Sequence, residues 1–125
     1  MTRLVRWFLS LEAAAFFAAA LVHSGVLMRG YEHSKAAIAE GVIAAVLAAA
    51  LIVTVLAPRA SRTVGLGAQG FALLGTVVGL FTIAIGVGPR TAPDLVFHAG
   101  MVAALIAGLV QLQRRHAGSP QGATP

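Results

Sequence analysis

Two histidines and a glutamate stand inside apolar stretches of the chain, at His23, Glu40 and His98. Imidazole nitrogens and carboxylate oxygens are ligands of Zn²⁺ and other first-row divalent ions, and water can complete such a site. Two histidines on different helices at one depth can instead hold haem b between them as axial ligands. A divalent metal ion or haem b is therefore one expectation for these three residues.

Glu12 adds an ionisable group to the first apolar stretch. Its separation from His23 is close to three turns of helix, at about 3.6 residues a turn, so both share one face. Gln69, in the third apolar stretch, is expected at the depth of Glu12, where its amide can pair with the carboxylate. Ionisable groups are costly to expose to lipid and must face protein or water. Glu12, Glu40 and Gln69 could accordingly form a proton relay.

A purely structural role has to be weighed beside both functions. His–Glu pairs between helices satisfy polar groups and fix helix register with no ligand at all. The sequence carries no HExxH motif, no Ser/His/Asp order and no Gly-rich phosphate loop, and it has no cysteine. No nucleophile has an identifiable activating partner, so we predict no catalytic residue and favour an enzyme least.

The elements that position these residues follow from a composition typical of integral membrane proteins. Of 125 residues, 58% are apolar and 10% are charged, against about 25% charged residues in soluble domains. Short connections make neighbouring spans antiparallel. The predicted fold is all-α, an up-down-up-down bundle of four antiparallel transmembrane helices in one domain, 1–116, with a disordered tail at 117–125. Spans of about 20 apolar residues are expected at 4–28, 36–57, 64–87 and 95–112.

Basic residues flank the spans and predict the orientation. The positive-inside rule places both termini in the cytoplasm of a multi-pass protein in the plasma or inner membrane. Basic pairs at span ends are typical of lipid contact and not of nucleic-acid binding. The basic start also resembles a signal peptide, although Glu12 interrupts its apolar region. Basic residues on the side of the termini are Arg3, Arg6, Arg59, Arg62, Arg114 and Arg115, against Arg29, Lys35 and Arg90 on the other.

That topology places His23, Glu40 and His98 in one layer near the outer boundary, at about 1.5 Å per residue. Glu12 and Gln69 form a deeper layer in the cytoplasmic half. Thr91 and Asp94 precede the fourth span at the spacing of a capping box. This box accounts for Asp94 without any further function.

Stripes of small residues in the third and fourth spans let helices approach closely, within one chain or across a homodimer. The sequence therefore leaves three functions open: a metal- or haem-binding accessory of a membrane redox or transport system, a dimeric proton-coupled small-solute transporter or channel, and a structural or assembly subunit. The lipid bilayer is the partner that composition requires. The stripes are Gly75, Gly79 and Gly86, and Gly100, Ala104 and Gly108.

Overall fold

The computed structural model describes the backbone of residues 2–117 and the side chains as far as Arg114. Four α-helices within this part are long and apolar enough to cross a membrane, which confirms the all-helical class. Most of the predicted tail, 117–125, lies outside the described residues. The elements are α1 (Thr2–His23), α2 (Ser34–Leu56), the 3-10 turn η1 (Pro58–Ala60), α3 (Ser61–Ala84) and α4 (Ala92–Ala117).

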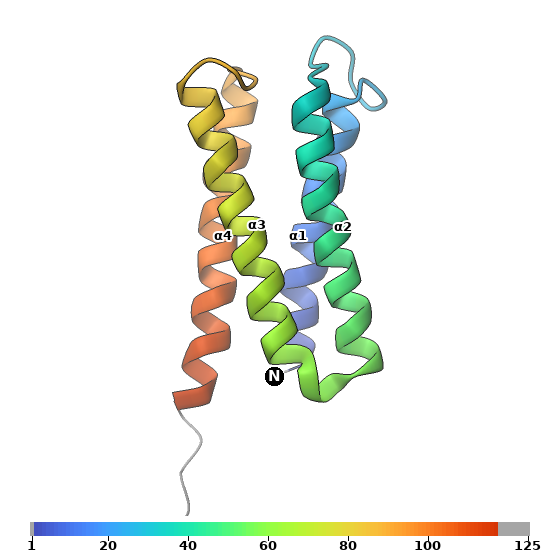
Figure 1. Cartoon of the computed structure of the whole chain (residues 1–125), viewed down its shortest axis with the longest axis vertical. Helices are drawn as coiled ribbons and strands as arrows, with labels where there is room; N and C mark the ends of the chain where they lie inside the picture. The colour runs from blue at the N-terminus through green and yellow to red at the C-terminus, as the bar shows by residue number, and fades with distance from the viewer. Residues whose placement is uncertain (1, 118–125) are drawn as a thin grey trace, which may run out of the picture.

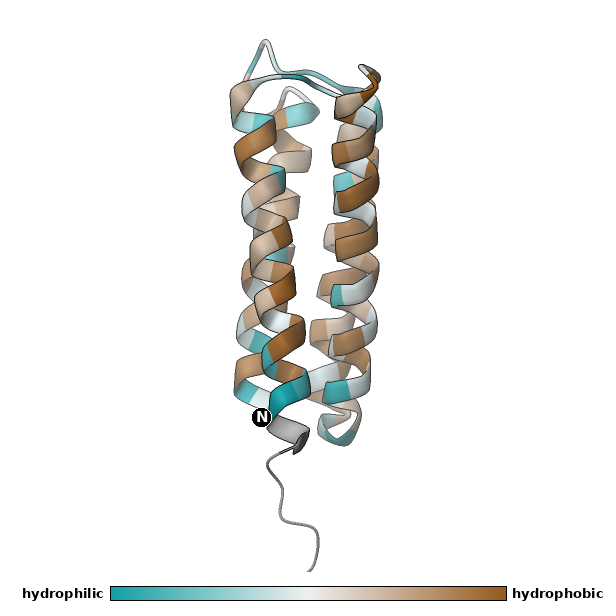
Figure 2. Cartoon of the chain, turned by 90° about the vertical axis from the view of Figure 1, so that its left-hand side faces the viewer, coloured by the Kyte–Doolittle hydropathy of each residue, from teal (hydrophilic) through white to brown (hydrophobic). Residues whose placement is uncertain are grey.

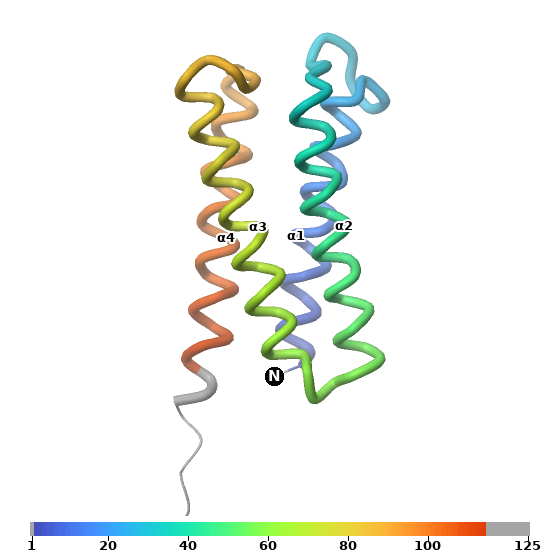
Figure 3. The backbone as a smooth tube through the Cα atoms, in the orientation of Figure 1, coloured from blue at the N-terminus to red at the C-terminus, as the bar shows by residue number. Residues whose placement is uncertain are grey.

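The helices form two pairs (Figure 1). The α1–α2 and α3–α4 loops lie at one end of the molecule, the loop end, and the N-terminus and the α2–α3 turn lie at the other, the turn end. The backbone trace shows α1 running along α2, and α3 along α4 (Figure 3). The two pairs contact each other mainly through α2 and α3, and contact between α1 and α4 is much less extensive. Each pair is thus closed by its own loop at the loop end.

Helix α1 ends at His23, before the predicted end of the first span at Met28. Gly25 has a φ of +77°, a left-handed conformation that glycine adopts without a steric penalty. The N–H of Val26 donates to the carbonyl of Leu21, which closes the last turn. The apolar residues that follow therefore belong to the loop, and His23 becomes the last residue of the helix.

The turn end is fastened by polar contacts to the backbone. Pro58 lies just beyond α2, where the sequence predicts the end of a span, because proline cannot continue the hydrogen-bond ladder. The guanidinium group of Arg6 donates to the carbonyl of Thr54 at 2.6 Å. This bond ties the start of α1 to the end of α2.

Apolar side chains both fill the interior and cover the outside. Figure 2 shows apolar residues along all the helices and hydrophilic residues at the ends. Soluble proteins rarely expose contiguous apolar surface on this scale, so the outer face is suited to lipid. The buried core includes Val5, Leu9, Leu47, Leu105 and Leu112, and exposed apolar residues include Leu11, Ile38, Val55, Leu74, Phe81 and Val96.

Glycines bring α3 close to its neighbours. A Cβ atom on Gly75 would lie 2.7 Å from Cδ1 of Ile43 in α2. On Gly79 it would lie 2.8 Å from Nε2 of His98 in α4. These two positions of the predicted stripe therefore pack within the chain. Gly100 differs, because it is exposed and its Cβ position has no atom within 4 Å.

Candidate functional site

Asp94 lies in the first turn of α4, where the predicted capping box is present. The N–H of Thr91 donates to Oδ2 of Asp94 at 3.1 Å, and the N–H of Asp94 donates to Oγ1 of Thr91 at 3.3 Å. The Thr91 hydroxyl also donates to Oδ2. One carboxylate oxygen thus stabilises the start of α4, and Oδ1 is left for another partner.

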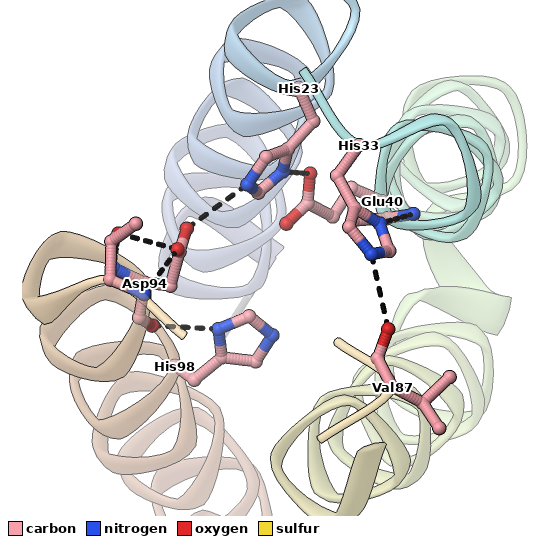
Figure 4. A network of polar contacts seen from close by, with 8 residues as sticks. His23, His33, Glu40, Val87, Asp94 and His98 are labelled. Carbon is pink, nitrogen blue, oxygen red and sulfur yellow. Dashed lines mark hydrogen bonds and ion pairs between the residues drawn. The ribbon is translucent and has the colours of Figure 1, made fainter. Parts of the chain in front are cut away.

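That partner is His23, which joins two carboxyl groups from other helices (Figure 4). Its Nδ1 atom lies 2.7 Å from Oε2 of Glu40, and its Nε2 atom lies 3.0 Å from Oδ1 of Asp94. None of the three residues is more than 6% exposed. We call Glu40, His23 and Asp94 the triad. It connects α1 to α2 within one helix pair and to α4 in the other.

The hydrogen bonds constrain the number of protons in the triad. A neutral imidazole has one N–H and one bare nitrogen, whereas an ionised carboxylate only accepts. With both carboxylates ionised, His23 must be an imidazolium that donates twice. With His23 neutral, one carboxyl group must be protonated. Both states carry one net negative charge, and the ion pairs of the described side chains include no Lys or Arg partner for it.

His98 lies one turn after Asp94. Its Nδ1 atom is 2.8 Å from the carbonyl oxygen of Asp94. A carbonyl only accepts, so Nδ1 of His98 carries the hydrogen. Within the described part of the chain Nε2 has no hydrogen-bond partner, and it lies beside Gly79. A neutral His98 therefore presents a bare nitrogen toward α3.

His33 bridges the two loops close to the triad. Its Nδ1 atom accepts from the N–H of Ala36 at 3.1 Å and caps α2. Its Nε2 atom donates to the carbonyl of Val87, in the α3–α4 loop, at 3.2 Å. The two rings of His33 and His23 have centroids 6.5 Å apart. His33 therefore ties one helix pair to the other at the loop end, as Figure 4 shows.

Two separate spaces adjoin the triad. A cavity of about 150 Å³ lies between α2 and α3, and Phe16 and His98 complete its wall beside Glu40. A more open groove of about 430 Å³ lies between α1 and α4, where His23 and Asp94 line it. Oε1 of Glu40 is buried and has no hydrogen-bond partner among the described residues. The triad therefore runs from the cavity, at Glu40, to the groove, at Asp94.

Glu12 and Gln69 form a second buried pair, as the sequence predicts. Nε2 of Gln69 lies 2.9 Å from Oε1 and 3.0 Å from Oε2 of Glu12. Gly108 of α4 packs against this amide with no room for a side chain. Oε1 of Gln69 is buried without a partner in the described part of the chain. The pair is well enclosed but not fully satisfied.

Aromatic rings separate this pair from the cavity. Phe16 follows Glu12 by one turn and packs edge-to-face on Phe97, with ring centroids 5.7 Å apart. Phe97 packs in turn on His98 at 5.5 Å. Phe16 lines the cavity, whereas Glu12 does not. The structure thus holds two polar layers with an aromatic layer between them.

The predicted metal ligands lie at the loop end but do not surround a common point. His23 meets Glu40, but both of its nitrogens face carboxylates. No group of three or more His, Asp or Glu side chains within the described residues is arranged to hold a metal ion. Axial ligation of haem requires a free nitrogen on each histidine. His98 has one and His23 does not.

Asp94 is the site residue that the sequence reasoning missed. Its place in a capping box explained it fully, yet such a box needs only one carboxylate oxygen. Its position one turn before His98 put it in the same layer, and this was the available signal. The structure shows that Oδ1 of Asp94 is the second partner of His23.

Comparison of the chain with protein-family models, curated proteins and solved structures finds no match. The geometry of the described residues is therefore the basis for any function proposed for the chain. Its central features are the triad and the two spaces that it separates.

Proposed function

We propose that the chain is a multi-pass protein of the plasma or inner membrane, an up-down-up-down bundle in one domain with both termini in the cytoplasm. The apolar length of the helices supports the membrane location. The excess of basic residues at the turn end supports the orientation. The loop end then faces outward. A homodimer would use the face of α4 around Gly100, which is exposed.

Proton movement through the triad, coupled to movement of a small solute, is the function that the geometry supports best. The observation that carries it is the position of the triad between two spaces, with Glu40 at the cavity and Asp94 at the groove. Ionisable residues inside membrane spans mark proton relays and substrate paths. Imidazole is suited to a relay because its two nitrogens can bind a proton on one side and release one on the other.

The relay step is balanced in atoms and charge. At the start Asp94 is protonated, Glu40 is ionised, and His23 carries its hydrogen on Nδ1. Asp94 passes its proton to Nε2 of His23, while Nδ1 passes its proton to Oε2 of Glu40. At the end Glu40 is protonated, Asp94 is ionised, and His23 carries its hydrogen on Nε2. The distances of 2.7 and 3.0 Å suit both transfers.

Glu12 and Gln69 extend this path toward the turn end. The pair lies beyond Phe16 from the cavity, and Oε1 of Gln69 has no hydrogen-bond partner among the described residues. A proton that leaves Glu40 for Glu12 has to pass the aromatic layer, so displacement of Phe16 would control that exchange. In this proposal Glu12, paired with Gln69, binds the proton between Glu40 and the turn end.

Proton flux into vesicles tests the proposal. The purified protein is reconstituted into liposomes that hold a luminal pH dye, with valinomycin and potassium to balance charge, and the outside is acidified. We expect faster luminal acidification than in protein-free vesicles. His23→Gln and Asp94→Asn should slow it by about ten-fold or more. Glu32→Gln is the matched control, because Glu32 is an exposed carboxylate in the α1–α2 loop.

The outcomes separate transport from structure. Equal flux in wild-type and protein-free vesicles would overturn the proposal. If the variants lose thermal stability but keep wild-type flux, the triad has only a structural role. Flux that falls in the triad variants and stays unchanged in Glu32→Gln would support the relay.

A metal-ion site is the second candidate, favoured by the cavity that Glu40 and His98 share, whereas haem is too large for a cavity of about 150 Å³. Oε1 of Glu40 lacks a partner there, and Nε2 of His98 is unpaired among the described residues. Such a protein would be an accessory or subunit of a membrane redox or transport system. The test is a visible absorption spectrum with elemental analysis of the purified protein. Stoichiometric metal that disappears in His98→Ala would favour this candidate.

A further inference from the structure

Among the described residues, the buried polar atoms left without a partner beside the cavity are hydrogen-bond acceptors, whereas Lys35, which also lines it, is an exposed donor. Oε1 of Glu40 is buried and has no hydrogen-bond partner in the part of the chain that the structure describes. Nε2 of His98 is bare when the ring is neutral, because Nδ1 holds the hydrogen. Thr76 and Thr82 also line the cavity, but their hydroxyl hydrogens are donated to backbone carbonyls, each at 2.7 Å. The matching ligand is a hydrogen-bond donor.

Charge points to the same kind of ligand. In each of the two protonation states described above the triad carries one net negative charge, and it ends in the cavity at Glu40. Among the described residues that line the cavity, α3 contributes no ionisable side chain, and the one Lys or Arg is Lys35 of α2, which is exposed and not buried beside Glu40. His33 and Lys35 lie at the rim, where Lys35 is exposed. A cation in the cavity would therefore complete the charge.

Size and lining narrow the class further. A cavity of about 150 Å³ holds a molecule of about the size of benzene. Its wall is largely apolar and includes the ring of Phe16 and the side chain of Ile43. Aromatic faces attract organic cations, and only two ligand atoms, from Glu40 and His98, are free for a metal. The lining suits a cation with an alkyl group better than a bare metal ion.

We propose that this cavity binds a small primary ammonium ion of about six non-hydrogen atoms or fewer. Its N–H groups donate to Oε1 of Glu40 and Nε2 of His98, and its alkyl group packs on Phe16. This inference rests on the proposed function, because it identifies the ammonium ion as the small solute whose movement is coupled to that of protons. A second proton on Oε1 of Glu40 would neutralise the triad as the cation does. The proton and the cation exclude each other, so a triad that holds this extra proton releases it when the cation binds.

Calorimetry with propylammonium chloride on the purified full-length protein in nanodiscs tests the site. We expect saturable binding that Glu40→Gln weakens at least about ten-fold, since the charge and an acceptor are lost. Propanol and propionate should not bind measurably. Tetramethylammonium should bind more weakly than propylammonium, because it has charge but no N–H group. Glu32→Gln should bind like the wild type.

A second variant keeps the test valid if Glu40→Gln does not fold. Ala36→Leu adds bulk to the cavity wall and keeps every ionisable group. It should weaken propylammonium binding about ten-fold while gel filtration and circular dichroism stay unchanged. Wild-type affinity in a folded Ala36→Leu protein would place the ligand elsewhere and overturn the inference. Stoichiometric zinc binding without propylammonium binding would also overturn it.

A pH indicator in weakly buffered solution separates this inference from the proposed function. Release of about one proton for each propylammonium bound, lost in Glu40→Gln, supports both. Binding without proton release supports the ammonium site and counts against proton coupling. No binding to the wild-type protein overturns the ammonium site, and the liposome flux then decides the relay alone.

Discussion

Nε2 of His23 lies 3.0 Å from Oδ1 of Asp94, although the two residues stand 71 positions apart in the chain. This contact joins the two helix pairs at the loop end, where direct packing between α1 and α4 is limited. The other nitrogen of His23 holds Glu40 within its own pair. One imidazole ring thus organises the polar contacts of three helices.

Removal of that ring should be strongly destabilising. His23→Ala leaves two buried carboxyl groups without their partner, which we expect to cost about 3–5 kcal/mol of unfolding free energy. Unfolding by denaturant in detergent micelles measures it. In the His23→Ala protein, Glu40→Ala should lower the unfolding free energy less than it does in the wild type, because the contact between His23 and Glu40 is already lost. Additive losses would contradict direct coupling of the two residues.

Gly79 should tolerate no side chain. A Cβ atom there meets Nε2 of His98 at 2.8 Å, so Gly79→Ala should destabilise the protein by about 1–3 kcal/mol. Gly67 on the same helix is the control, because its Cβ position is open. Gly67→Ala should stabilise by about 0.5–1 kcal/mol. Thermal unfolding compares the two, and addition of His98→Ala should restore much of the loss in Gly79→Ala. Equal effects of the two alanines would refute the contact.

Glu12 should separate stability from transport. Glu12→Ala leaves the amide of Gln69 buried without its acceptor, which should cost about 1–3 kcal/mol. Glu12→Gln keeps the size and a carbonyl acceptor, so it should fold with nearly wild-type stability. Because an amide, unlike a carboxylate, does not bind and release protons near neutral pH, proton flux in liposomes should fall about ten-fold or more. A fully active Glu12→Gln protein would remove this pair from the proton path.

His33 caps α2 and also bonds to Val87, and different substitutions can test these two roles separately. His33→Ala removes the N-cap of α2 and the bond to Val87, and it should lose about 1 kcal/mol. Asn is a good N-cap but is too short to replace the ring at Val87. His33→Asn should therefore keep stability and speed hydrogen exchange in the α3–α4 loop. Unchanged exchange in both variants would show that the bond does not restrain the loops.

The sequence predicted the helices and several contacts because these depend on position along the chain. Apolar length identified four spans, and depth paired Glu12 with Gln69. The spacing of Thr91 and Asp94 identified a capping box. Each of these inferences depends only on the depth of a residue along a helix axis or on the spacing of residues that are close in the sequence.

The pairing of His23 with two carboxylates could not be predicted in the same way. It depends on how α1, α2 and α4 are rotated about their axes, and hydrophobic helices with little polar asymmetry leave that rotation open. The end of α1 at His23 could not be predicted either, because several residues that follow His23 are also apolar. Gly25 ends the helix through its backbone conformation and not through polarity.

The described histidines differ in where their hydrogens are held, and this has a spectroscopic consequence. His33 accepts at Nδ1 and donates at Nε2, whereas His98 donates at Nδ1. Each ring, when neutral, therefore provides a reference spectrum for one tautomer. The nitrogen-15 resonances of His23 can be compared with both in a single sample. The protein thus contains the reference signals needed to assign the protonation state of its own central imidazole.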